Sequence, residues 1–148
     1  MPTVTLADMI TFDEGSRKYP YKCTAGKITI GVGRNLEDVG ISQDEIQYLL
    51  NNDLARVRLE LINDPDIGKI YSSLDEVRQM AIKNMCFNLG LAGLKKFKKM
   101  WKALEHKNYD EAAKQAIDSR WYRQVKSRGP RVVHVIKHGN LDSYAEVL

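Results

Sequence analysis

Three side chains that could carry out chemistry lie near the start of the chain: Glu14, Cys23 and Thr29. A carboxyl group can donate a proton, and a thiol can act as a base or as a nucleophile. Eight residues separate the carboxyl from the thiol, and five more separate the thiol from the hydroxyl. The elements that hold these groups therefore decide whether they can work on one substrate.

The pattern around the thiol and the hydroxyl predicts a tight turn followed by a strand. In the turn, Gly26 supplies the positive φ that such a bend needs, and residues 27–32 then alternate with the period of a half-buried strand. The alternation predicts a buried face of Ile28, Ile30 and Val32 and an outward face of Lys27, Thr29 and Gly31. With Gly31 and Gly33 lacking side chains, we expect a cleft wall that a bulky substrate approaches closely.

The run from Asp13 to Asn35, DEGSRKYPYKCTAGKITIGVGRN, resembles the catalytic segment of the phage lysozymes, the endolysin muramidases of glycoside hydrolase family 24. That family has Glu, eight residues, Asp (Cys in some members), five residues and Thr. The resemblance covers almost the whole chain and is closest to the T-even phage branch. The other matching positions are Gly15, Tyr21, Thr24, Gly26, 29–31, Gly33, 71–75, 84–85, Phe87, Gly90, 119–122, Arg128, Arg131 and Val132.

The resemblance implies a role for each reactive side chain. Glu14 would protonate the departing glycosidic oxygen, and burial would have to keep its proton on near neutral pH. Thr29 would hold the attacking water. Cys23 stands where most members have an Asp base, and about 10% of a free thiol of pKa about 8.5 is thiolate near pH 7.5. Action as a base and direct attack on the sugar both remain open. The plainer alternatives are a solvated carboxylate, a packed thiol and an ordinary strand threonine.

The same resemblance implies substrate contacts on both halves of the chain. Arg128 matches an arginine that pairs with the catalytic glutamate, so we interpret it as orienting Glu14; a solvated arginine is the alternative. Asp13 and Arg131 match a structural salt bridge of the family. The residues that we assign to substrate binding are Gly33, Arg34, Phe87, Asn88 and Arg128.

Length and composition indicate a single folding unit. A chain of 148 residues can bury a sizeable core, and 43% hydrophobic with 28% charged residues is ordinary for a globular protein. The first apolar stretch, residues 4–12, is too short and too polar for a signal peptide or membrane anchor. Two cysteines imply no dense disulfide framework.

The chain predicts a predominantly α-helical α+β, lysozyme-like fold with two lobes. We expect a helix over residues 3–12, a β segment over about 19–34, and a long helix to Asn63 that begins with a capping box of Ser42 and Glu45. A second capping box, Ser73 with Glu76, predicts a buried helix to Leu89. The single domain, 1–148, would divide into a β-containing lobe with the linking helix (13–62) and a helical lobe (1–12 and 63–148).

The two halves of the chain differ in charge. Residues 75–148 carry 15 Lys and Arg against 8 Asp and Glu, a net charge of +7, whereas residues 1–74 carry 8 against 11, a net charge of −3. A basic half favours a polyanionic partner, such as an anionic wall or outer-membrane polymer. Residues 94–104 predict a basic amphipathic helix, either a surface helix with solvated lysines or one drawn to an anionic surface.

The resemblance to the phage lysozymes implies a muramidase that cleaves the β-1,4 bond between N-acetylmuramic acid and N-acetylglucosamine in peptidoglycan. A lytic transglycosylase using Glu14 alone and a non-catalytic wall-binding or virion module are the alternatives. No helix-turn-helix, zinc spacing or RNP motif supports nucleic-acid binding. His106, His134 and His138 show no ligand spacing with Cys or acidic residues, so we expect no metal site. We also expect no cofactor, and we expect the protein to be a monomer. The resemblance implies accumulation in the host cytoplasm and access to the periplasmic wall through a holin lesion.

Overall fold

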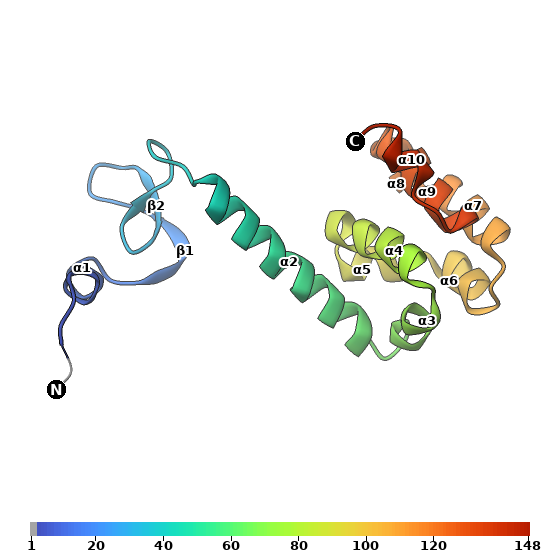
Figure 1. Cartoon of the computed structure of the whole chain (residues 1–148), viewed down its shortest axis with the longest axis horizontal. Coiled ribbons are helices and arrows are strands. Elements are labelled where there is room, and N and C mark those ends of the chain that lie inside the picture. The colour runs from blue at the N-terminus through green and yellow to red at the C-terminus, as the bar shows by residue number, and fades with distance from the viewer. Residues whose placement is uncertain (1–2) are drawn as a thin grey trace. The chain divides into compact units, whose positions relative to one another are not determined.

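The computed structural model describes residues 3–148, and its elements have the predicted predominantly helical α+β composition (Figure 1). Within these residues, ten helices accompany one antiparallel sheet of strand order β1-β2-β3. In chain order the elements are α1 (Leu6–Glu14), β1 (Arg17–Lys22), β2 (Ile28–Gly31), β3 (Arg34–Asn35), α2 (Gln43–Asn63), α3 (Gly68–Ser73), α4 (Glu76–Leu89), α5 (Leu91–Lys95), α6 (Lys98–Glu105), α7 (Tyr109–Ile117), α8 (Arg120–Gln124), α9 (Arg128–His138) and α10 (Asp142–Ala145). The predicted fold class is confirmed.

The chain forms two compact units, Met1–Leu49 and Leu50–Leu148. The first holds α1 and the sheet, the second holds α3 to α10, and α2 contributes residues to both. The predicted grouping of residues 1–12 with the helical lobe stays a prediction. No helix within residues 3–148 combines the length and the apolar character that a membrane span requires.

Helix α1 ends at the residue expected to do the chemistry. Its first turn is closed by a capping box in which Asp8 N–H donates to Thr5 Oγ1 at 3.1 Å and Thr5 N–H donates to Asp8 Oδ2 at 2.9 Å. Its last residue is Glu14, because Gly15 takes a φ of 80°, which glycine adopts without strain. The carboxyl group therefore projects from a helix end beside the entry to β1.

The sheet contradicts the predicted assignment of the faces of the strand. Thr29 is only 3% exposed, whereas Ile28 is 41% and Val32 is 40% exposed, so the buried and outward faces are the reverse of the expectation. The reason is the position of β2 between two partners, since Thr29 pairs with Tyr21 of β1 and with Asn35 of β3. Directly paired residues share a face, so these two larger side chains flank the threonine.

The predicted capping box at the start of α2 is confirmed. Glu45 N–H donates to Ser42 Oγ at 3.2 Å, and Ser42 N–H donates to Glu45 Oε1 at 2.9 Å. The helix ends at Asn63, as expected. Asp64 follows it and accepts the backbone N–H groups of Asp66 and Ile67 at 2.9 and 3.0 Å.

The second predicted capping box is wrong, although the helix that it introduced is present and ends at Leu89. Asp75 is the N-cap residue of α4, and its Oδ2 accepts the N–H of Arg78 at 3.1 Å. Ser73 instead ends α3, where its hydroxyl donates to the carbonyl of Ile70 at 2.7 Å. An aspartate next to the helix start displaces a serine two residues further away, because both compete for the same N–H groups.

The core lies in the second unit. Helix α4 contributes Ala81, Ile82, Met85 and Cys86, all of them buried. Helices α6, α7 and α9 contribute most of the other buried hydrophobic residues: Met100, Trp101, Ala103, Leu104, Ala112, Ala113, Ala116, Val132, Val133, Val135 and Ile136. The predicted burial of the helix over residues 76–89 is confirmed for this inner face.

The lysine-rich segment is amphipathic, as predicted, but it is not one helix. It breaks between α5 and α6, where Phe97 takes a φ of −76° and a ψ of 55°. Of the predicted apolar stripe, Leu94, Trp101 and Leu104 are buried and Phe97 packs against the core. Lys95 forms ion pairs with Asp64 and Asp66 at 3.0 and 2.8 Å, whereas Lys98, Lys99 and Lys102 are exposed.

Candidate active site

The carboxyl of Glu14 lies against the turn between β2 and β3. Glu14 is exposed, so the burial expected to keep its proton on is absent from this structure. A side chain at Gly33 would place its Cβ 3.2 Å from Glu14 Oε2 and 3.3 Å from Glu14 Cδ. Gly33 also has a φ of +66°, a conformation that other residues adopt only with strain. The backbone therefore favours glycine here, and any larger residue would also push the Glu14 carboxyl from its present position. The predicted contact of Gly33 with substrate stays a prediction.

The thiol of Cys23 sits inside a tight turn built as predicted. Cys23 N–H donates to the carbonyl of Lys27 at 2.9 Å, Gly26 N–H donates to the carbonyl of Cys23 at 2.8 Å, and Gly26 has a φ of +79°. The turn aims backbone donors at the sulfur: hydrogen bonds from Lys27, then Ala25, lower the pKa of the Cys23 thiol, and the Thr29 side chain adds to the effect. Cys23 is half-buried and unpaired.

Thr29, in strand β2, stabilises this turn through a hydrogen bond. Its hydroxyl donates to the carbonyl of Lys27 at 2.9 Å, so the buried oxygen is satisfied by its own strand. The structure thus brings Cys23 and Thr29 together, as their spacing predicted. Sequence reasoning missed the backbone N–H donors of Ala25 and Lys27, because every residue except proline has such a group and the sequence does not show where it points. The glycine of the tight turn was the only sequence feature that indicated them.

Arg34 is engaged by the first unit itself. Its Nη1 donates to Glu45 Oε1 at 2.8 Å and to the carbonyl of Gly40 at 3.1 Å. The hydrogen bond from Arg34 is the largest cause that lowers the pKa of the Glu45 carboxyl, to about 2. The ion pair joins β3 to the first turn of α2. A contact between Arg34 and substrate stays a prediction.

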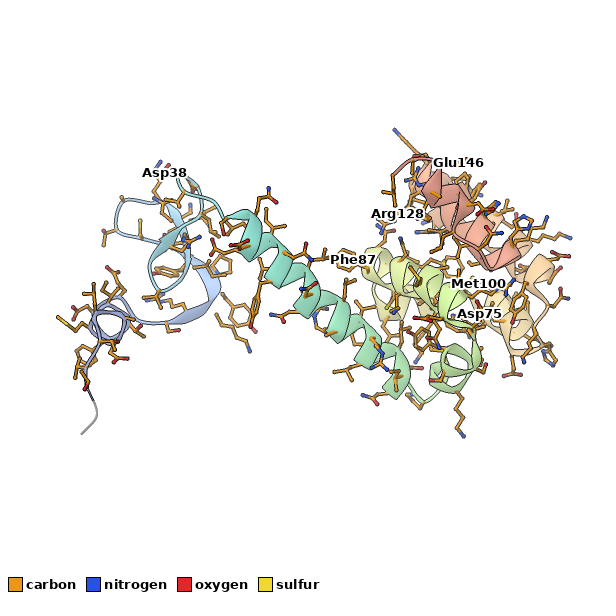
Figure 2. All side chains as sticks on the ribbon, viewed as in Figure 1. Asp38, Asp75, Phe87, Met100, Arg128 and Glu146 are labelled. Atoms are coloured by element: carbon orange, nitrogen blue, oxygen red, sulfur yellow. The ribbon has the colours of Figure 1, made fainter. Side chains whose placement is uncertain are left out.

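The other predicted residues lie in the second unit, and two of them line one pocket. Phe87 of α4 and Arg128 at the start of α9, both labelled in Figure 2, border a pocket of about 510 Å³. Arg128 Nε donates to Asn84 Oδ1 at 2.9 Å, a partner that sequence reasoning matched to the family without giving it a role. The remaining residues of the pocket are Leu50, Leu54, Ala55, Arg58, Met80 and Lys83.

Asn88 has a structural partner. Its Oδ1 accepts the indole N–H of Trp121 at 2.9 Å, which ties the end of α4 to α8. Phe87, the residue before it, is 45% exposed. The predicted pairing of Arg128 with Glu14, and that of Asp13 with Arg131, stay predictions. So do the substrate contacts of Phe87, Asn88 and Arg128.

Comparison with known proteins finds similarity over most of the chain. Residues 12–136 match the phage lysozyme family. The chain is 33% identical over 166 residues to probable T4-type lysozyme 1 of Dictyostelium discoideum, with 95% of this chain and 98% of that protein covered. It is 32% identical over 168 residues to the pre-baseplate central spike protein Gp5 of Enterobacteria phage T4, with 97% of this chain but 29% of that protein covered.

Proposed function

The chain belongs to the phage lysozyme family, and from that premise we propose that this peptidoglycan-hydrolysing lysozyme cleaves the β-1,4 bond between N-acetylmuramic acid and N-acetylglucosamine. The observation that carries the proposal is the coexistence, in one compact unit, of the Glu14 carboxyl resting on Gly33 and a Cys23 thiol of lowered pKa. A proton donor and a base are the two groups that hydrolysis of a glycosidic bond requires.

Glu14 acts first, as the general acid. It gives its proton to the glycosidic oxygen as the bond to the anomeric carbon breaks, and the leaving sugar departs as an alcohol. Because Gly33 has no side chain, the carboxyl rests directly on the backbone of the β2–β3 turn. That support restricts the directions in which the acid can point, which is how a positioned group gains rate over one in solution.

Cys23 acts as the base in this proposal. Its thiolate takes a proton from water as the water oxygen bonds to the anomeric carbon, so the second product is an α-anomer formed with inversion. The lowered pKa favours the thiolate, which a base must be. Proton exchange with solvent then returns Glu14 to the acid form and Cys23 to the thiolate. Thr29 supports the turn that carries the sulfur, because its hydroxyl donates to the carbonyl of Lys27 at 2.9 Å, and its side chain adds to the lowering of the pKa of Cys23. The expected contact of Thr29 with the attacking water stays a prediction.

Purified peptidoglycan tests the proposal. Wild type should clear a peptidoglycan suspension, and Glu14→Gln should fail to do so. Mass spectrometry of the released fragments should find reducing N-acetylmuramic acid ends. Anhydro sugars at the fragment ends would show that the reaction is lytic transglycosylation rather than hydrolysis. Clearing by Glu14→Gln at the wild-type rate would show that Glu14 is not the general acid.

We propose lysis of the host cell as the biological role, with the enzyme reaching the periplasmic wall from the cytoplasm through a membrane lesion. Co-expression with a holin should then turn a silent culture into a lysing one. The alignment with part of a spike protein supports a second candidate, a lysozyme unit carried on the virion. Detection of the chain in purified virions would favour this second candidate, and absence from them would favour the endolysin.

A further inference from the structure

Two histidines of α9 form a contact that the proposed catalysis does not use. His134 and His138 are one helical turn apart, and their rings lie with centroids 4.4 Å apart at an interplanar angle of 43°. The core-facing residues of α9 are Val132, Val133, Val135 and Ile136. Because a helix turns by 100° per residue, positions 134 and 138 fall on the side opposite to that core face.

The geometry points to a binding site for one divalent transition-metal ion held by both imidazoles. Two histidines at positions i and i+4 of a helix present their rings to the same point in space, the arrangement that metal-binding helices use. Ligands on adjacent corners of a metal at about 2.1 Å lie roughly 3 Å from each other. Rings whose centres are 4.4 Å apart can meet that requirement with small rotations.

The ring environment indicates which nitrogen binds. Nδ1 of His134 is buried and lacks a hydrogen-bond partner among the described residues, so we assign Nε2 as the nitrogen that binds the ion. His138 is exposed at the last position of the helix. The carboxyl end of a helix carries partial negative charge, which favours a cation there. Lys137 and the guanidinium of Arg78, which donates to the carbonyls of Ile136 and Lys137, bring positive charge to the same end and oppose this attraction.

The donor set determines the kind of ion. Within residues 3–148 there is no cluster of three or more His, Cys, Asp or Glu side chains able to hold a metal, so the two imidazoles would share the ion with water. Imidazole ligands suit Ni²⁺, Cu²⁺ and Zn²⁺, and a two-ligand site binds them in the order of intrinsic affinity. The site therefore lacks the closed shell of structural zinc, and it is separate from the proposed chemistry of Glu14 and Cys23.

The expected consequence is stabilisation of the folded chain rather than catalysis. Only the helix holds both rings at one point, so the ion binds the folded state more tightly than the unfolded chain. The last turn of α9 is already held by Arg78, which donates to the carbonyls of Ile136 and Lys137 at 2.6 and 3.0 Å. A bridge between His134 and His138 would add a second constraint on the same turn.

Calorimetric titration of the full chain with Ni²⁺ tests the site. Wild type should bind one ion through this pair, and His134→Asn and His138→Asn should each weaken binding about tenfold or more, because one imidazole then acts without the other. His106→Asn is the matched control: it removes a single exposed histidine elsewhere and should bind as wild type does. All four proteins keep Cys23, so any contribution from its thiol is common to them.

Thermal unfolding gives an independent readout. Saturating Ni²⁺ should raise the Tm of wild type and His106→Asn by about 2 °C or more, and it should leave the Tm of His138→Asn unchanged. The Tm of each protein without metal shows that the variants fold. Equal binding by wild type and His138→Asn, or an equal loss in His106→Asn, would overturn the site.

Discussion

In the proposed mechanism, the thiol of Cys23 takes the role that a carboxylate has in most members of the family. An aspartate is ionised at neutral pH without assistance, whereas a thiol needs stabilisation of its charged form. The turn provides it, because hydrogen bonds from Lys27 and Ala25 lower the pKa of the Cys23 thiol. Cys86, the other cysteine, has the opposite environment, since burial raises the pKa of its thiol to about 11.

The two cysteines should therefore react with iodoacetamide at different pH values. The rate at Cys23 should rise at a lower pH than the rate of a free cysteine does, because the thiolate is the reacting form and hydrogen bonds from the turn lower the pKa of this thiol. Cys86 should remain unmodified over the same range, since it is buried and its pKa is raised. Mass spectrometry of peptides after timed alkylation measures both rates, and a midpoint for Cys23 equal to or above that of free cysteine under the same conditions would contradict the turn's effect.

Alkylation of Cys23 should also abolish lysis, whereas Cys23→Asp should keep lysis and resist the reagent. NMR of the first-formed anomer then distinguishes the two routes left open by the sequence. An α-product supports the thiolate base, and a β-product would mean that the sulfur attacks the sugar to give a covalent intermediate. Full activity of Cys23→Ala would reduce Cys23 to a packing residue.

Glu14→Gln should lower the lytic rate by about 10²–10⁴, the usual contribution of a positioned general acid. The change is nearly isosteric and Glu14 is exposed, so the Tm should stay close to that of wild type. Glu105→Gln removes an exposed carboxyl at the end of α6 and serves as the control with unchanged rate. A Glu14→Gln variant with half of the wild-type rate would rule out the assignment.

At the scale of elements, sequence patterns predicted the tight turn at Gly26 and the start of α2 correctly, but not the cap of α4 or the faces of β2. The turn at Gly26 and the capping box of Ser42 and Glu45 depend on neighbours within four residues, and both are confirmed. The burial of Thr29 depends on Tyr21 and Asn35, which reach it only through the sheet. Alternation identified β2 but could not tell which side the pairing strands would cover.

The β2–β3 turn offers a paired test of the carboxyl support. Gly33→Ala and Gly40→Ala both force alanine into a φ of +66°, and each should cost roughly 1–2 kcal/mol of stability. Only at Gly33 does the new Cβ approach Glu14, whereas at Gly40 it meets nothing within 4 Å. Gly33→Ala should therefore lose about 10²-fold in lytic rate, the effect of a small misplacement of a catalytic group. Equal rates in the two variants would separate Gly33 from catalysis.

The start of α4 gives a prediction about stability alone. Asp75→Ala removes the side chain that caps the helix and should lower the free energy of unfolding by about 0.5–2 kcal/mol. Ser73→Ala, at the position that the sequence pattern favoured, should cost less because its hydroxyl only bonds within α3. Urea unfolding of both variants measures the order, and a larger loss at Ser73 would contradict the observed cap.

At the scale of the whole molecule, the uneven charge leads to a prediction about recruitment of the enzyme to its substrate. Residues 75–148 have a net charge of +7, and Lys98, Lys99 and Lys102 of α6 are exposed and make no ion pair within residues 3–148. A surface of this kind attracts anionic polymers over a range set by the Debye length, about 8 Å at physiological ionic strength. A polyanionic partner stays a prediction, and the composition does not identify it, because charge alone does not distinguish lipid phosphate from wall carboxylate.

Salt should therefore affect lysis of whole cells more than cleavage of a small neutral oligosaccharide. Raising the ionic strength screens attraction between the basic half and an anionic surface, while cutting a neutral substrate needs no such attraction.

Replacing Lys98, Lys99 and Lys102 by Gln should remove much of the salt dependence on cells and leave the oligosaccharide rate unchanged, because these side chains point to solvent. As a control, Lys137→Gln replaces one exposed lysine outside this group, on α9. Rates for both substrates, measured from low to physiological salt, decide the matter: parallel curves would show that the charge serves solubility, whereas divergent curves would show that the basic half concentrates the enzyme at the wall.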